Sequence, residues 1–182
     1  QQSFLPAAMK KAEELGYPPY LLTKRTFVDA FAAGQLIARI AVNIDMDGQP
    51  FQAPCALLMT GELTVAVEGG KGIGGRNQEF ALSAAKVIKD NPNIVIAAVD
   101  TDGTDGPGGN FNSTAWLKGC KNLAGGITDG YTMQEACERH IDFEQAFREH
   151  NTSDILWKLD SGIWAVQNIS IQDLIVVLIM KK

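Results

Sequence analysis

The sequence has few features that would tie the protein to nucleic acid or to a membrane. Acidic side chains outnumber basic ones by 21 to 16 among 182 residues, and the formal net charge is −5. No block of lysine or arginine is present, so the electrostatic attraction on which nonspecific binding to nucleic acid or anionic lipid depends is missing. No apolar run approaches the roughly 20 residues that a transmembrane helix requires. We therefore expect neither nucleic acid nor a membrane as a partner.

Cysteine and histidine are also scarce. The three cysteines, Cys55, Cys120 and Cys137, lie far apart and form no C-x-x-C pair, which is typical of a reducing compartment. We therefore expect a cytoplasmic protein, and a mitochondrial location stays open for a longer form. Neither His140 nor His150 lies near a nucleophile-like turn, so no Ser-His-Asp arrangement is expected. The chain begins at Gln1 within a predicted helix, and we expect it to be a fragment of a longer protein.

Apolar periodicity predicts alternating helices and strands. Helical patterns occupy residues 4–16, 26–46, 77–90 and 132–150. Extended apolar patterns occupy residues 53–59, 63–67, 93–99 and 173–180. This alternation favours an α/β fold, with a layered mixed sheet and flanking helices. Because the polar, motif-rich loops all follow Met59, we predict one unit over residues 1–58 and a second over residues 59–182.

The first segment that carries chemistry is "EGGKGIGGR", residues 68–76, between a predicted strand and a predicted helix. Backbone amides at a glycine-rich turn and at a helix N-terminus together form an anion site. Lys71 and Arg76 add positive charge, and the planar arginine fork matches a phosphate or carboxylate. Asn77 is well suited to cap the helix. The segment lacks the Gly-Lys-[Ser/Thr] ending of a Walker A loop.

Two other interpretations of the glycine segment stay open. Gly70, Gly72 and Gly75 satisfy the pattern G-x-G-x-x-G, and Asp100 at the end of the next strand could take the place of a ribose-binding acid. These features are compatible with a dinucleotide-binding turn. The glycines could equally form a tight turn whose basic residues are only solvated.

The second segment is "DTDGTDGPGG", which begins at the end of an apolar strand. Asp100, Asp102 and Asp105 are close in sequence, and crowded carboxylates repel one another unless a cation, donors or water compensate. Mg²⁺ brought by a nucleotide would need only one or two of them. An EF-hand is excluded because Asp105 and Phe111 stand where that loop requires glycine and glutamate. Turns stabilised by aspartate side chains remain the alternative.

The two segments together carry a family resemblance. "KGIGGRNQE" followed by "VDTDGTDGP" resembles the C-terminal MOFRL domain of glycerate 2-kinases, proteins also labelled hydroxypyruvate reductases. "GELTVAVEG" fits as well, and "AAMKKAEELGY" looks like the end of the family's N-terminal kinase domain. The resemblance thus implies that residues 1–58 are the remnant of that kinase domain and that residues 59–182 are a MOFRL-like domain. Its specific motifs lie within residues 61–107.

The resemblance implies a transferase that moves the γ-phosphoryl of ATP to the 2-hydroxyl of D-glycerate, with Mg²⁺, in a cleft between two α/β domains. The implied catalytic residues are Arg76, Asp100 and Asp102. The implied residues for binding substrate and phosphate are Lys71, Gly72, Gly74, Gly75, Asn77 and Glu79. The implied metal ligands are Asp102 and Asp105.

Two departures from the family pattern keep other functions open. "MTGE", Met59 to Glu62, stands where the family has serine and two glycines before the glutamate, and "WAVQNISIQDL", residues 164–174, replaces a motif rich in glycine and threonine. Trp164, Val166 and Ile169 are bulky where small residues are expected, and only Asp173 and Leu174 clearly match the family motif. The alternatives are a degenerate, non-catalytic structural or interaction domain and an NAD(P)-dependent hydroxypyruvate reductase. We expect the fragment alone to be inactive, and its oligomeric state stays open, a homodimer included.

Overall fold

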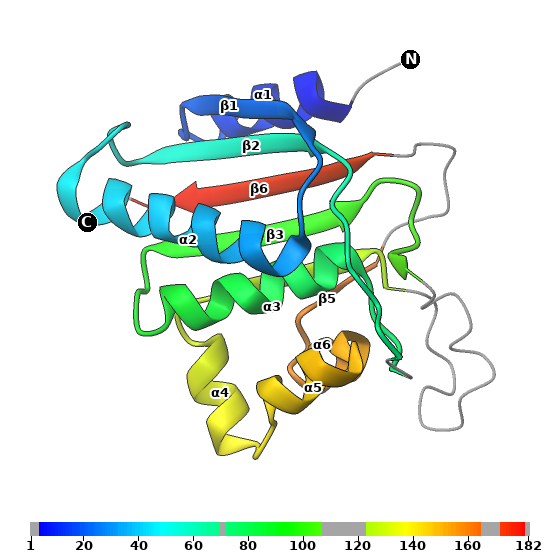
Figure 1. Ribbon diagram of the computed structural model, residues 1–182. Coiled ribbons are helices and arrows are strands. Elements are labelled where there is room, and N and C mark those ends of the chain that lie inside the picture. Colours follow the sequence, from blue (N-terminus) through cyan, green and yellow to red (C-terminus); the bar gives the residue numbers. More distant parts are fainter. Residues whose placement is uncertain (1–3, 70–71, 107–122, 165–171, 181–182) are drawn as a thin grey trace.

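The computed structural model describes residues 4–69, 72–106, 123–164 and 172–180 (Figure 1). Its helices are α1 (Phe4–Glu14), α2 (Ala30–Asp47), α3 (Arg76–Ile88), α4 (Thr132–Glu138), α5 (Phe143–Glu149) and α6 (Thr152–Lys158). Its strands are β1 (Pro19–Thr26), β2 (Cys55–Gly61), β3 (Ile94–Asp100), β4 (Gly125–Asp129), β5 (Gly162–Ile163) and β6 (Asp173–Ile179). Among these described residues, no helix combines the length and apolar character needed to span a bilayer.

All the strands belong to one mixed sheet with the order β1-β2-β6-β3-β4-β5. β1 and β2 are parallel, and every other neighbouring pair is antiparallel. β2 and β3 therefore run in the same direction with β6 reversed between them. Asp173, the first residue of β6, pairs with Gly61 at the end of β2 and with Asp100 at the end of β3. This register gathers three strand ends at one edge of the sheet, and the α/β class with a mixed sheet is confirmed.

Helices cover the two faces of the sheet unequally (Figure 1). α2 and α3 pack on one face, where Ile44 and Phe80 join the inward side chains of β2, β3 and β6 in the main core. On the other face Leu5 of α1 packs against Leu58 of β2. The side of α3 away from α2 buries Leu82 against α4, α5 and α6. α3 is thus enclosed by neighbours, and its polar first turn lies at the gathered strand ends.

The sequence predicted most long elements but misplaced some shorter ones. The helix patterns in residues 4–16, 26–46 and 77–90 and the strand patterns in residues 53–59, 93–99 and 173–180 correspond to α1, α2, α3, β2, β3 and β6. The strand predicted over residues 63–67 is wrong, since only Thr64 forms an isolated bridge, to Asp29. The ladder ends at Gly61, and the Leu63 amide donates to the Asp173 carboxylate instead of to a strand. The helix predicted over residues 132–150 is divided into α4 and α5.

The predicted boundary between residues 58 and 59 falls inside β2. Strands on both sides of this boundary, β1 and β6, pair with β2 in the same sheet. α1 also packs against Ala56 and Leu58, so the first part of the chain shares its packing with the sheet of the second. The division into two domains stays a prediction about a longer protein.

The close packing of α2 against α3 gives a test of this architecture. A Cβ added at Gly34 would lie 2.4 Å from the Phe80 carbonyl oxygen, within a helix pair that has no space to separate. Glycine to alanine inside a helix normally stabilises by about 1 kcal/mol. Here we expect Gly34→Ala to lower the free energy of unfolding by about 1–3 kcal/mol because of overpacking. Urea denaturation measures this, with the exposed Arg39→Ala on α2 as control; a stabilised Gly34→Ala variant would contradict the packing.

Candidate active site

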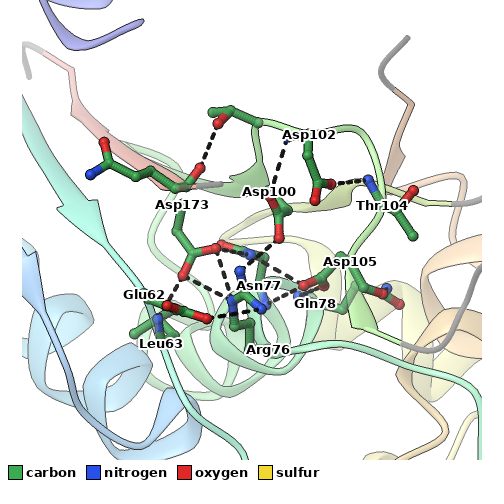
Figure 2. Close-up of polar contacts among 12 residues, drawn as sticks. Glu62, Leu63, Arg76, Asn77, Gln78, Asp100, Asp102, Thr104, Asp105 and Asp173 are labelled. Atoms are coloured by element: carbon green, nitrogen blue, oxygen red, sulfur yellow. Dashed lines mark hydrogen bonds and ion pairs between the residues drawn. The ribbon is translucent and has the colours of Figure 1, made fainter. Parts of the chain in front are cut away.

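The candidate site lies where β2 and β3 end and β6 begins, against the first turn of α3. Arg76 Nε donates to both oxygens of Asp173, at 3.0 and 3.1 Å, and its Nη2 donates to Asp100 Oδ2 at 2.7 Å (Figure 2). Both carboxylates are buried, whereas the arginine side chain is 22% exposed. Its Nη1 lies 4.0 Å from Oε1 of the exposed Glu62, beyond hydrogen-bond distance. Arg76 therefore joins β3 to β6 and keeps one side of its guanidinium near solvent.

The N-terminus of α3 is capped by a carboxylate from a different segment. Asp105 Oδ1 accepts from the Asn77 amide at 3.1 Å, and Asp105 Oδ2 accepts from the Gln78 amide at 2.9 Å. The residue at the N-cap position is Gly75, which has no side chain to serve as a cap. The prediction that Asn77 caps the helix is therefore wrong: Asn77 lies within the first turn, fully buried, and the buried Asp105 supplies the cap.

The glycines of the first segment are required by close packing against protein. A Cβ at Gly72 would lie 2.4 Å from the Glu149 carbonyl oxygen, and one at Gly74 would lie 2.3 Å from Thr152 Oγ1. A Cβ at Gly75 would lie 2.3 Å from the Asp105 carboxylate, although its φ of −163° is open to any residue. The glycines thus allow residues 72–75 to pass between Asp105 and the turn that joins α5 to α6.

This packing bears on two expectations about the glycine segment, an anion site made by its backbone amides and a dinucleotide-binding turn. The Gly72 amide donates to the Glu149 carbonyl, and the Ile73 amide donates to Asn151 Oδ1, so neither is directed at a ligand. Residues 62–75 separate β2 from α3, so a tight strand-to-helix turn of the dinucleotide-binding kind is absent from the described residues. The interpretation closest to the structure is a close-packed glycine turn. Gly70 and Lys71 lie outside the described residues.

The aspartate segment forms hydrogen-bonded turns after β3. The Asp102 amide donates to Asp100 Oδ1 at 3.2 Å, and the Thr104 amide donates to Asp102 Oδ1 at 2.8 Å. Asp100 and Asp105 are buried, while Asp102 is only partly buried. The hydrogen bonds and ion pairs of Arg76 within the described residues go to Asp100, Asp173 and Glu62 and not to Asp102, so the three predicted aspartates occupy distinct environments (Figure 2).

Burial raises the pKa values of the site carboxylates. It raises the pKa of Asp100 to about 6, although the Asp102 amide and the Arg76 charge act in the opposite direction. It raises the pKa of Asp105 to about 7, against the hydrogen bonds from Gln78 and Asn77. It also raises the pKa of Asp173, against the donors Asn77, Leu63 and Arg76. The cause throughout is the loss of water around a charged group, which the donors compensate only in part.

Glu79 connects the first turn of α3 to the turn between α5 and α6, against which the glycines pack. Its Oε2 lies 3.1 Å from Nδ1 of His150, the residue that ends α5 with a φ of 52°. Burial raises the pKa of Glu79, and the hydrogen bond to His150 opposes that rise. The His150 carbonyl oxygen in turn lies against Gly74. Glu79 thus helps to hold the turn against which Gly74 packs, and its implied part in binding substrate or phosphate stays a prediction.

The structure brings together only part of the predicted set. Arg76, Asn77, Asp100 and Asp105 meet in one network, whose fifth member, Asp173, received no functional role from the sequence. Two signals were available for Asp173: its match to the family motif, and its position as a lone carboxylate at the start of an apolar strand, "QDLIVV". Its importance depends on the register with β2 and β3, which the sequence does not give. Residues 165–171, within the divergent motif, lie outside the described residues.

The described residues contain no group of three or more histidine, cysteine, aspartate or glutamate side chains placed to hold a metal ion. Both oxygens of Asp105 already accept hydrogen bonds from α3, so this residue does not fit the expected role of metal ligand. Asp102 fits better, since it is partly exposed and Mg²⁺ needs only one or two protein carboxylates.

The protein is thus an α/β domain with a polar site at the strand ends. At this site, carboxylates from two strands hold an arginine at a helix N-terminus. Residues 55–168 match the MOFRL family, and the chain belongs to this family. The chain is 39% identical over 153 residues to the glycerate 2-kinase of Pyrococcus horikoshii, which covers 84% of this chain and 32% of that protein. It is 34% identical over 176 residues to the D-glycerate 2-kinase of Thermotoga maritima, which covers 95% and 38%.

The fold is similar to solved structures as well. The crystal structure of a glycerate kinase from Thermotoga maritima aligns with a TM-score of 0.85 at 32% identity, over 96% of this chain and 39% of that one. The chain thus spans 32 to 39% of the length of these relatives. The resemblance inferred from the motifs is confirmed.

The raised pKa of Asp105 predicts how stability depends on pH. Because the folded-state pKa of about 7 exceeds the 3.8 of an unperturbed aspartate, the contribution of Asp105 is fully present below about pH 4 and is lost as the pH rises through 7. We expect Asp105→Asn to remove this contribution. The difference in unfolding free energy between wild type and Asp105→Asn should then fall by a few kcal/mol, to order of magnitude, from pH 4 to pH 8.

Urea denaturation across this pH range measures the effect. Asp47→Asn, which removes the same charge at an exposed position at the end of α2, is the control. Parallel pH profiles for wild type and Asp105→Asn would show that the buried carboxylate carries no such linkage.

Proposed function

We propose that this chain is the C-terminal part of a glycerate 2-kinase-like enzyme, which transfers phosphate from ATP to the 2-hydroxyl of D-glycerate. The observation that carries the proposal is the fixed position of Arg76, within the motif that it shares with the family. Two hydrogen-bonded carboxylates hold its Nε and Nη2, and Nη1 faces the exposed Glu62 at 4.0 Å. An anion can approach that side of the guanidinium, and the substrate carboxylate or the transferring phosphoryl group has the matching chemistry.

The charge balance of the site favours a phosphate that arrives with a cation. Arg76 faces three buried carboxylates, those of Asp100, Asp105 and Asp173, so the ionised cluster carries more negative than positive charge. A free phosphate would be repelled by this excess, and a Mg-nucleotide, whose cation cancels part of the phosphate charge, would be repelled less. Mg²⁺, when bound, neutralises the phosphate oxygens during transfer. Asp102 is the residue best placed to contact it, directly or through water.

Phosphoryl transfer suits a site of this kind because it depends mainly on positioning and charge neutralisation. In the proposal Arg76 contacts the reacting anion, Asp100 and Asp173 hold the guanidinium, and Asp102 faces the cation. The network supports these roles because Asp100 and Asp173 are buried and both accept hydrogen bonds from Arg76. We propose in addition a cytoplasmic enzyme whose cleft is completed by a second α/β domain, as in the two-domain family.

Two other functions receive less support. An NAD(P)-dependent hydroxypyruvate reductase would need the dinucleotide turn, which residues 72–75 do not form because they pack against the α5–α6 turn. A degenerate structural domain remains a real alternative, since residues 59–62 depart from the family pattern. That alternative predicts that no ligand binds at Arg76.

Isothermal titration of the chain with Mg-ADP and with D-glycerate tests the proposal. We expect weak binding of at least one ligand, and a loss of about tenfold or more in affinity for Arg76→Ala, since a charge-assisted hydrogen bond contributes roughly 1.5–3 kcal/mol. Arg39→Ala, which removes an equal charge from an exposed position on α2, should bind as wild type does. NADH is titrated in parallel.

The outcomes separate the three functions. Binding that Arg76→Ala abolishes and Arg39→Ala preserves supports a kinase half-site. Binding of Mg-ADP or glycerate that is equal in both variants would remove Arg76 from the proposed site. Binding of NADH alone would favour the reductase, and binding of no ligand would favour the degenerate domain.

A further inference from the structure

We propose that Asp105 is a positioning residue for Arg76, acting through Asn77 and Asp173, and that this is its role in place of metal binding. The inference deepens the proposed function, on which it rests for the statement that Arg76 binds an anion. Its basis is a chain of contacts that begins at the cap of α3 and ends at the guanidinium.

The first step in this chain is the side-chain amide of Asn77. Its Nδ2 donates to Asp105 Oδ1 at 3.2 Å and to Asp173 Oδ1 at 2.7 Å, so one amide group joins the two carboxylates (Figure 2). The same Asp173 oxygen accepts from Arg76 Nε at 3.0 Å. Asp105 is thereby connected to Arg76 through two intervening side chains, each of which accepts or donates at a defined atom.

The second step is the rigidity of these side chains. Asp105 and Asn77 are fully buried, and no Cβ could be added at Gly75 without meeting the Asp105 carboxylate. The backbone amides of Asn77 and Gln78 hold both Asp105 oxygens, while the Leu63 amide holds the second oxygen of Asp173 at 2.6 Å. Neither carboxylate can turn without losing a buried hydrogen bond, so the position of Asp105 is transmitted to the guanidinium.

The third step is the energetic cost of burying the Asn77 side chain. With both amide hydrogens directed at carboxylates, its Oδ1 is buried and has no hydrogen-bond partner among the described residues. A buried unpaired acceptor destabilises a fold. A small apolar side chain would avoid this cost and leave the backbone cap of α3 intact, so the contribution specific to asparagine is the connection between Asp105 and Asp173.

The test compares two variants that break the connection at different points. In Asp105→Asn one carboxylate oxygen becomes an amide group that faces the donors of α3. Asn77→Ala leaves the backbone cap in place and removes only the connection to Asp173. Asp45→Asn is the matched control: this partly buried carboxylate accepts from the side chains of Asn91 and Asn93, away from Arg76.

The primary readout is the ¹H–¹⁵N signal of Arg76 Nε in the folded chain and its rate of exchange with water. We expect both site variants to move this signal and to speed exchange by about tenfold, since the Nε–H bond to Asp173 becomes less ordered. Asp45→Asn should lower stability and leave the Nε signal in place. The affinity for Mg-ADP, measured on the same samples, should weaken in the two site variants and not in the control.

The outcomes distinguish this inference from the proposed function. Folded Asp105→Asn and Asn77→Ala variants with an unchanged Nε signal and unchanged exchange would overturn the positioning role, whatever the chain binds. If Asp105→Asn does not fold, Asn77→Ala decides the question alone. If the Nε signal moves as expected while wild type binds neither Mg-ADP nor D-glycerate, the connection stands and the proposed function fails.

Discussion

The arrangement of the site depends on how buried carboxylates are compensated at the first turn of α3. Burying a charge is costly unless donors and an opposite charge surround it. Here the N-terminus of α3 supplies two backbone amides to Asp105, and the side-chain amide of Asn77 donates to two carboxylates. The Arg76 guanidinium donates to Asp100 as well as to Asp173. The raised pKa values of Asp100 and Asp105 indicate that the compensation is incomplete. A site of this kind attracts protons or a cation, which is the electrostatic character that a Mg-nucleotide requires.

The sheet topology explains why these groups meet at all. In a mixed sheet with β6 reversed between β2 and β3, the start of one strand lies beside the ends of two others. A carboxylate at the start of β6 can therefore contact a helix that follows β2 in the chain. Asp173 and Arg76 are 97 residues apart in sequence, yet the register of the strands and the packing of α3 bring them to 3.0 Å.

Sequence reasoning predicted the long elements and the two segments that carry the chemistry, because periodicity and residue type are local properties. It selected Arg76, Asn77, Asp100 and Asp105, all of which lie in the network. It did not find Asp173 as a site residue, and it named the wrong residue as the N-terminal cap of α3. Both depend on contacts between distant segments. The strand expected at residues 63–67 failed for the same reason: its apolar pattern is strand-like, but a distant carboxylate takes the Leu63 amide.

The glycine-rich segment shows that a residue pattern can predict close backbone approach without identifying the group that approaches. Glycines permit close approach, and the sequence alone leaves open whether a phosphate, a dinucleotide or protein approaches them. In this fold the approaching groups are the Glu149 carbonyl, Thr152 and Asp105. The anion at the N-terminus of α3 is likewise a carboxylate of the chain itself. Since the helix terminus is already occupied, a phosphate at this edge has to be met by a side chain. The partly exposed guanidinium of Arg76 offers its Nη1, which lies 4.0 Å from Glu62, beyond hydrogen-bond distance.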